Sequence, residues 1–105
     1  MNFNEYQKQA MASLKQFENK NEMVANVGLG LCGESGEVAD ILKKHLLKSK
    51  ELDLLHLKEE LGDVLWYIAE ACECFQINLE DVASGNIEKL KKRHPKGFDG
   101  YGIRE

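Results

Sequence analysis

Apolar side chains recur every three or four residues along almost the whole chain, which is the spacing of amphipathic α-helices. Proline occurs once, at Pro95, and β-branched residues are sparse, so the pattern does not favour strands. The apolar stripes cover residues 3–17, 24–45, 54–75 and 82–90. Because the links between them are short, we predict an all-α chain resembling a four-helix bundle.

Polar residues mark the expected helix ends. The run 18–21 is expected to close the first helix, and residues 48–50 the second. Asn78 has the character of an N-cap for the fourth helix, and Pro95 stops that helix after a basic last turn. We expect a single helical domain over residues 1–98 and a C-terminal tail over residues 99–105, with loop structure from Lys96 onward.

The length and charge of the chain narrow the function classes. A chain of 105 residues that is 43% hydrophobic can bury one modest core. Its net charge is −4, with basic residues concentrated after residue 85, so a nucleic-acid coat protein is not expected. No apolar run approaches the ~20 residues that span a bilayer, and no signal peptide is evident. The three cysteines include no CxxC pair, and we expect a cytoplasmic protein with reduced thiols.

A glycine-rich run from Gly28 to Gly33 fits the dinucleotide pattern GxGxxG, and Asp53 follows at the distance of a ribose acceptor. That fingerprint requires a preceding strand and a parallel sheet, and no later segment could pair with residues 23–27. We therefore do not expect a dinucleotide-binding fold. Close approach of another helix or of a ligand is the favoured explanation for these glycines.

Two pairs of carboxylates are the most informative feature. Glu34 and Glu37 lie three residues apart on the second predicted helix, and Glu60 and Asp63 repeat that spacing on the third. Residues at this spacing are neighbours on one helix face, and both pairs border the apolar stripes. A short link makes the two helices antiparallel neighbours, so we expect the four carboxylates to converge.

Four converging anions repel one another and resist loss of solvent, and a divalent cation with oxygen ligands would offset both effects. We expect Mg²⁺ as the cofactor, with Mn²⁺ able to replace it. The cysteines are not spaced as ligands and we expect no histidine beside either pair, so zinc is not predicted. Ordinary surface acids paired with lysines are the alternative interpretation.

The basic C-terminal segment and one aromatic residue are candidates for contact with a substrate. Lys89 and Arg93 lie four residues apart on one face of the fourth predicted helix, with Asn86 one turn earlier, and could meet phosphates. A solvated helix end that complements the helix dipole is the alternative for this run. Tyr67 follows Asp63 by four residues and faces the same way, where it could meet a ligand.

Three ordered motifs together resemble the MazG-like nucleoside triphosphate pyrophosphohydrolases of the all-α NTP pyrophosphatase superfamily. They read Glu34-Ser-Gly-Glu37-Val-Ala-Asp40, then Glu59-Glu60-Leu-Gly-Asp63-Val-Leu-Trp66-Tyr67, then Asn86-Ile-Glu-Lys89-Leu90-Lys-Lys-Arg93-His-Pro95-Lys-Gly97-Phe98. The resemblance spans about residues 24–98. It implies a helical homo-oligomer, either a dimer or a tetramer, whose active sites form partly at subunit contacts.

The same resemblance implies Mg²⁺-dependent hydrolysis of (deoxy)nucleoside triphosphates between the α- and β-phosphates, for house-cleaning or nucleotide-pool control. The implied metal ligands are Glu34, Glu37, Glu60 and Asp63, and the implied substrate contacts are Tyr67, Asn86, Lys89 and Arg93. Either Glu37 or Glu59 is the expected general base. The alternative functions are a phosphoribosyl-ATP pyrophosphohydrolase and a non-catalytic helical dimerisation or regulatory module.

Overall fold

The computed structural model describes residues 1–98, and in this range every regular element is helical, as predicted. The elements are α1 (Phe3–Met11), α2 (Lys20–Leu47), α3 (Leu54–Cys74), α4 (Leu79–Arg93) and a short 3₁₀-helix, η1 (Pro95–Phe98). No helix in the described part of the chain combines the length and the apolar character that crossing a membrane requires.

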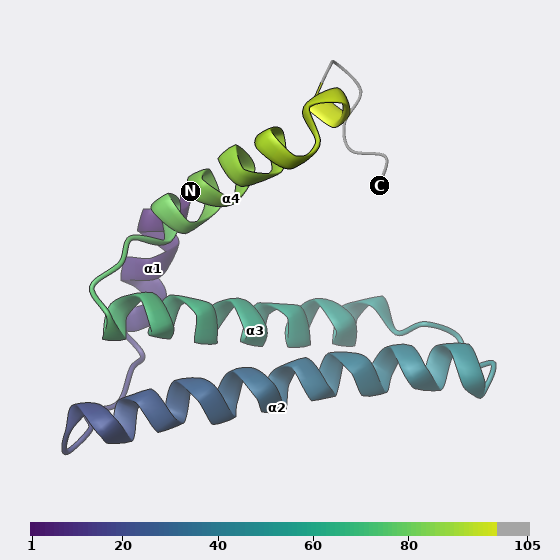
Figure 1. Ribbon diagram of the computed structural model, residues 1–105. Helices are drawn as coiled ribbons and strands as arrows, with labels where there is room; N and C mark the ends of the chain where they lie inside the picture. The colour runs from purple at the N-terminus through teal and green to yellow at the C-terminus, as the bar shows by residue number, and fades with distance from the viewer. Residues whose placement is uncertain (99–105) are drawn as a thin grey trace.

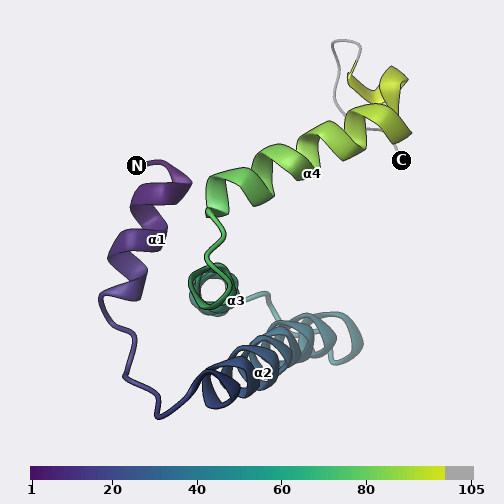
Figure 2. The same ribbon diagram turned by 60° about the vertical axis from the view of Figure 1, so that its left-hand side comes forward.

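The two long helices, α2 and α3, lie antiparallel and side by side (Figure 1). Helices α1 and α4 pack near the C-terminal end of α3 (Figure 1). Seen nearly along α3, the hairpin partner α2 lies on one side and α1 and α4 on the other (Figure 2). Within residues 1–98, α2 contacts neither α1 nor α4. The arrangement is therefore an open hairpin with an attached helical end rather than a closed four-helix bundle.

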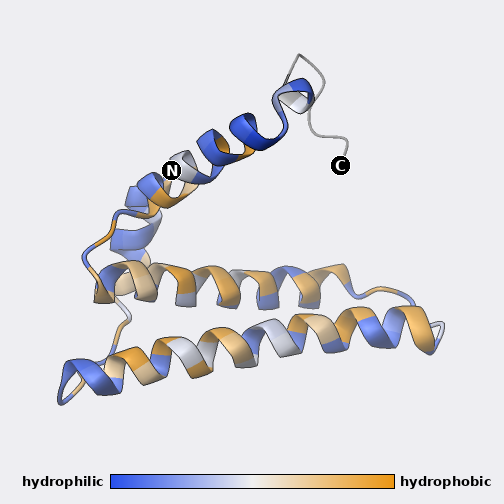
Figure 3. Ribbon diagram, viewed as in Figure 1, coloured by the Kyte–Doolittle hydropathy of each residue, from blue (hydrophilic) through white to orange (hydrophobic). Residues whose placement is uncertain are grey.

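A small core forms where α1, α3 and α4 meet. Its buried members are Ala69, Cys72 and Leu79, against which Tyr6, Ala10, Met11, Leu65 and Ile68 pack. Hydrophobic residues run along both α2 and α3, whereas α4 becomes hydrophilic toward its C-terminal end (Figure 3). Much of this apolar surface is uncovered in the single chain, since Leu29 is 76% exposed and Leu55 is 69% exposed.

The first helix is shorter than the apolar stripe predicted. It ends at Met11 because the carbonyl of Ala10 accepts hydrogen bonds from the Ser13 hydroxyl at 2.7 Å and from the Trp66 indole at 3.1 Å. The backbone N–H of Ser13 also donates to this carbonyl at 3.1 Å, so the helix end is well supplied with donors. Leu14 and Phe17 consequently lie in the connection to α2, where they are half-buried.

The other helix ends follow their caps. Asn19 accepts a hydrogen bond from Glu22 N at 2.8 Å, so α2 begins inside the polar run that was expected to be a link. Asp53 caps α3 in the same way, and the predicted N-cap position of Asn78 is confirmed. The Asn78 side chain makes no cap bond, however. Residues 95–98 form η1 rather than the expected loop, and the remaining tail, 99–105, lies outside the described residues.

The direction of α4 depends on a buried glutamine of α1. Gln7 accepts a hydrogen bond from Leu79 N at 2.8 Å and donates to the carbonyl of Ile77 at 3.1 Å. The same amide lies 3.3 Å from Glu73 Oε1. These bonds tie the turn between α3 and α4 to α1 and provide an acceptor for the first N–H group of α4.

The glycine-rich run lies inside α2, and residues 1–98 contain no strand, so the dinucleotide-binding alternative is wrong. The expected close approach is confirmed at Gly30, where an added Cβ would overlap the ring of Tyr67. Within residues 1–98, no other helix of the same chain approaches Gly28, Gly33 or Gly36, because a Cβ at each would meet open space.

Candidate functional site

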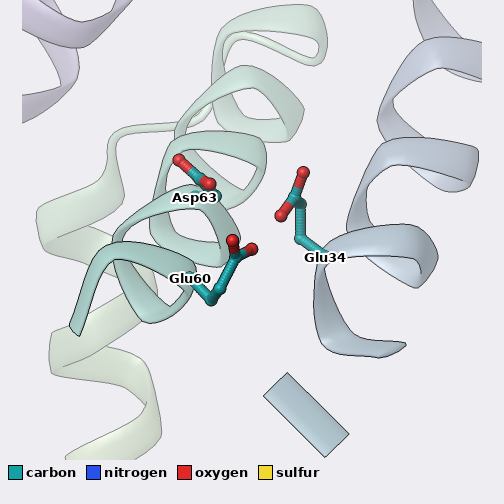
Figure 4. A group of neighbouring side chains, drawn as sticks. All are labelled: Glu34, Glu60 and Asp63. Atoms are coloured by element: carbon teal, nitrogen blue, oxygen red, sulfur yellow. The ribbon is translucent and has the colours of Figure 1, made fainter. Parts of the chain in front are cut away.

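Three acidic side chains meet across the α2–α3 hairpin. Glu34 comes from α2, while Glu60 and Asp63 come from one face of α3 (Figure 4). One carboxylate oxygen of each lies within 4.8 Å of one oxygen of the other two. The antiparallel pairing of the two helices thus brings together residues that are far apart in the sequence.

The cluster is partly withdrawn from solvent. Glu34 and Glu60 are half-buried, whereas Asp63 is exposed at the edge. Oε2 of Glu60 is buried and has no hydrogen-bond partner. A buried carboxylate oxygen without a donor costs free energy, so this atom indicates that the cluster has an additional partner.

A histidine lies beside this carboxylate, contrary to our expectation from the sequence. His56 precedes Glu60 by one helical turn, and its Nε2 lies 3.5 Å from Glu60 Oε1. Its ring is about half exposed. His56 therefore borders the cluster and contributes a nitrogen, although it does not belong to the group of three oxygens.

The crowding of negative charge changes the titration of Glu34. The pKa of Glu34 is raised from 4.5 to about 7, first of all by a hydrogen bond with Glu60. Partial burial and the nearby charges of Asp63, Glu60 and Glu37 contribute to the same rise. The crowding of acidic groups therefore favours the protonated form of Glu34 when no metal is bound.

This raised pKa predicts how stability depends on pH when metal is absent. The folded chain binds a proton between about pH 4.5 and 7 that the unfolded chain has released. The stabilisation is thus complete below about pH 4.5 and is lost as the pH rises through about 7. Thermal melts in chelator from pH 5 to 8 should show this decline in the wild type and a flatter profile for Glu34→Gln. Parallel profiles for the two proteins would contradict the prediction.

The fourth predicted ligand, Glu37, is not part of the cluster. It is exposed, and it lines a neighbouring pocket of about 340 Å³ between the end of α2 and the start of α3, together with Lys44, His45 and His56. Three residues along a helix correspond to about 300°, so Glu37 is turned to one side of Glu34. The negative charge of Glu37 nevertheless contributes to the raised pKa of Glu34. Glu59, the other candidate base, is exposed on α3.

Tyr67 lies one turn beyond Asp63, as expected, but its ring is packed between the two helices. The ring occupies the space above Gly30, where any Cβ would overlap it. It also meets the ring of Trp66 edge-on, with the centroids 5.1 Å apart. Tyr67 is half-buried, so one part of it remains accessible next to the cluster.

The predicted phosphate contacts on α4 are not brought to the cluster within one chain. Asn86, Lys89 and Arg93 are all exposed, and α4 makes no contact with α2 in the described residues. Helix α4 leads away from the hairpin after the turn at residues 75–78 (Figures 1 and 2).

The sequence analysis missed a polar pair in the same interface. Asn26 of α2 donates to both carboxylate oxygens of Glu70 of α3 at 3.0 Å, and Glu70 is fully buried. Asn26 lies eight residues before Glu34, and Glu70 lies seven residues after Asp63. Each therefore lies on the same face of its helix as the acidic residues of the cluster. Extending the spacing argument by two turns would have revealed them.

The residues present fit a hard divalent cation. Glu34, Glu60 and Asp63 supply only oxygen atoms, and the partnerless buried oxygen of Glu60 belongs to one of them. Carboxylates from two helices, with one edge open to water, suit Mg²⁺, which binds a few carboxylates and retains water ligands. The nitrogen of His56 at the rim suits a borderline metal better, but one nitrogen among three carboxylates does not make a zinc site.

Comparison with known proteins identifies the family of the chain. Residues 23–98 match the family described as MazG nucleotide pyrophosphohydrolase domain. Over 81 residues, the chain is 36% identical to the Gene 37 protein of Mycobacterium phage L5, covering 72% of this chain and 70% of the phage protein. No solved structure matches the chain. The chain belongs to the MazG nucleotide pyrophosphohydrolase family, a class of hydrolases, and its substrate is a nucleotide.

Proposed function

We propose that this protein is a Mg²⁺-dependent hydrolase of (deoxy)nucleoside triphosphates that cleaves between the α- and β-phosphates. The products are a nucleoside monophosphate and pyrophosphate, which suits house-cleaning or control of a nucleotide pool. The observation that carries the proposal is the cluster of three carboxylates across α2 and α3, within the span that matches the family.

The metal site follows from the cluster. Glu34, Glu60 and Asp63 would hold Mg²⁺, and Glu37 would join them if its side chain turned inward. When bound, the cation supplies charge neutralisation for the phosphates and lowers the pKa of bound water. Mn²⁺ should replace it, because the ligands are hard oxygen atoms.

The chain's own residues take the remaining roles. A carboxylate, either Glu37 or Glu59, accepts the proton of the attacking water. The water oxygen forms a bond to the α-phosphorus while the α–β anhydride bond breaks, and the bridging oxygen leaves with the pyrophosphate group. Tyr67 contacts the substrate from beside Asp63, and its fixed position over Gly30 gives that contact a defined place.

The exposed residues of α4 support an oligomer. Lys89 and Arg93 cannot serve the cluster of their own chain, since α4 does not touch α2. The hairpin also leaves large apolar side chains open, with Leu29, Leu46, Leu47, Leu54, Leu55 and Leu61 each at least half exposed. We infer that a second copy covers this surface, and that its α4 brings Asn86, Lys89 and Arg93 to the phosphates.

The experiment that tests the function is product analysis over a panel of natural and modified nucleoside triphosphates with Mg²⁺. We expect monophosphate and pyrophosphate, and no reaction in chelator. Orthophosphate and a diphosphate would overturn the proposed bond. Activity on phosphoribosyl-ATP alone would assign the second enzyme class, and a folded protein that is inactive on all of them would indicate a non-catalytic module.

A further inference from the structure

A buried polar pair with no part in the proposed chemistry joins the two long helices. Glu70 is fully buried, and the partner that it has is the amide of Asn26, with Nδ2 3.0 Å from each carboxylate oxygen. Burying a carboxylate with a single amide donor is unfavourable compared with an apolar side chain of similar size. A contribution to stability therefore does not explain why this polar pair is buried between the helices.

Apolar packing alone does not define how α2 lies along α3. Val27 is the buried residue of α2, and leucines along both helices remain exposed. Leu–Leu contacts of this kind can re-form after one helix slides along the other by a turn, about 5.4 Å. The acidic cluster in the middle of the hairpin adds repulsion, because Glu34 faces two further carboxylates.

Directional contacts do define the register. From Glu34, Gly30 lies one turn back and Asn26 two turns back, about 12 Å along α2. From Asp63, Tyr67 lies one turn on and Glu70 nearly two, about 10 Å along α3. Because the helices are antiparallel, Gly30 meets Tyr67 and Asn26 meets Glu70 only in the register that brings Glu34 to Glu60.

We propose that Asn26 and Glu70 are positioning residues that lock the register of α2 against α3 and thereby assemble the carboxylate cluster. The lock acts two turns away from the cluster and touches neither substrate nor metal. A slip of one turn would separate the pair by more than a hydrogen bond can span and would carry Glu34 past its partners. The link to metal binding rests on the proposed function, whereas the register itself does not.

The test uses a double variant, Asn26→Leu with Glu70→Leu, which we call the leucine pair. Apolar replacement of a buried polar pair commonly preserves or raises stability, so this variant should stay folded. We expect its Mg²⁺ affinity, measured by calorimetry, to fall about 10- to 100-fold, the loss typical of residues that orient metal ligands. Glu70→Gln keeps an acceptor for Asn26 and should retain near wild-type affinity. The control Asn21→Leu, on the exposed start of α2, should change nothing.

A second measurement determines the register of α2 against α3 in the absence of metal. Spin labels on exposed Cys32 of α2 and on Lys58→Cys, at an exposed position of α3, report the relative position of the helices in chelator. Dilution with unlabelled chains removes distances between subunits. One narrow distance distribution is expected for the wild type and for Glu70→Gln, and a broadened or shifted one for the leucine pair.

The outcomes separate the two proposals. Unchanged distances and unchanged Mg²⁺ affinity in the leucine pair would overturn the register lock. A wild type that binds no Mg²⁺ would overturn the proposed metal site, while the distances would still decide the lock. If the leucine pair fails to fold, Glu70→Met, which keeps the length of the side chain and removes the acceptor, takes its place in both measurements.

Discussion

Replacing Glu60 by glutamine is expected to reduce pyrophosphate release at least about a hundredfold, beyond the usual cost of changing a residue that only orients a ligand. Glu60 lies at the centre of the cluster, within hydrogen-bond reach of Glu34 and beside His56. Its amide would keep the shape of the side chain but lose the charge that attracts a cation. Initial rates with Mg²⁺ and the preferred triphosphate measure this loss.

The same substitution should stabilise the metal-free protein, because it removes one of the repelling carboxylates and leaves the buried Oε2 position able to become a donor. The melting temperature in chelator should therefore rise, while the further rise caused by Mg²⁺ should shrink. Glu18→Gln, at an exposed position before α2, is the control and should show neither effect. A Glu60→Gln variant with normal activity would contradict the assignment of the cluster as the metal site.

Replacing Gly30 by alanine is expected to destabilise the fold strongly for so small a change. The added Cβ would overlap the ring of Tyr67, which also meets the ring of Trp66 edge-on. Overpacking of this kind costs about 1–3 kcal/mol, and the better helix propensity of alanine returns about 1 kcal/mol at most. We expect a net loss of about 1 kcal/mol, or a melting temperature lower by about 4–8 °C.

Gly28→Ala is the matched control for this prediction. Gly28 lies in the same helix, and a Cβ there would meet open space. Helix propensity alone then applies, and the melting temperature should rise by up to about 4–8 °C. Equal effects of the two alanines would show that Tyr67 does not pack against Gly30 as described. The sign of the difference between them is thus the decisive observation.

Most of the helices could be predicted from the sequence, because a periodic apolar stripe is a local property. The stripe over residues 54–75 predicted α3 (Leu54–Cys74) to within one residue, and Asn78 marked the start of α4. The first helix was predicted too long, since the Trp66 indole and the Ser13 hydroxyl end it, and the indole comes from more than fifty residues away. Such a contact leaves no trace in the local periodicity.

The acidic residues were also recognisable in advance, but their arrangement was not. Two carboxylate pairs on neighbouring helices indicated a cation site, and three of the four members do converge. Glu37 does not, and its exposed side chain lines the neighbouring pocket instead. His56 was overlooked beside Glu60, although its spacing of four residues was visible in the sequence.

The sequence by itself determined the helical class, the pairing of acids on two helices, and the family, since each of these depends on residue type and spacing. The tertiary structure alone decided which carboxylates meet, that Tyr67 rests on Gly30, and that Asn26 holds Glu70. The reason is physical. Spacing sets the face on which a side chain lies, but only the register and rotation of two packed helices set which faces touch.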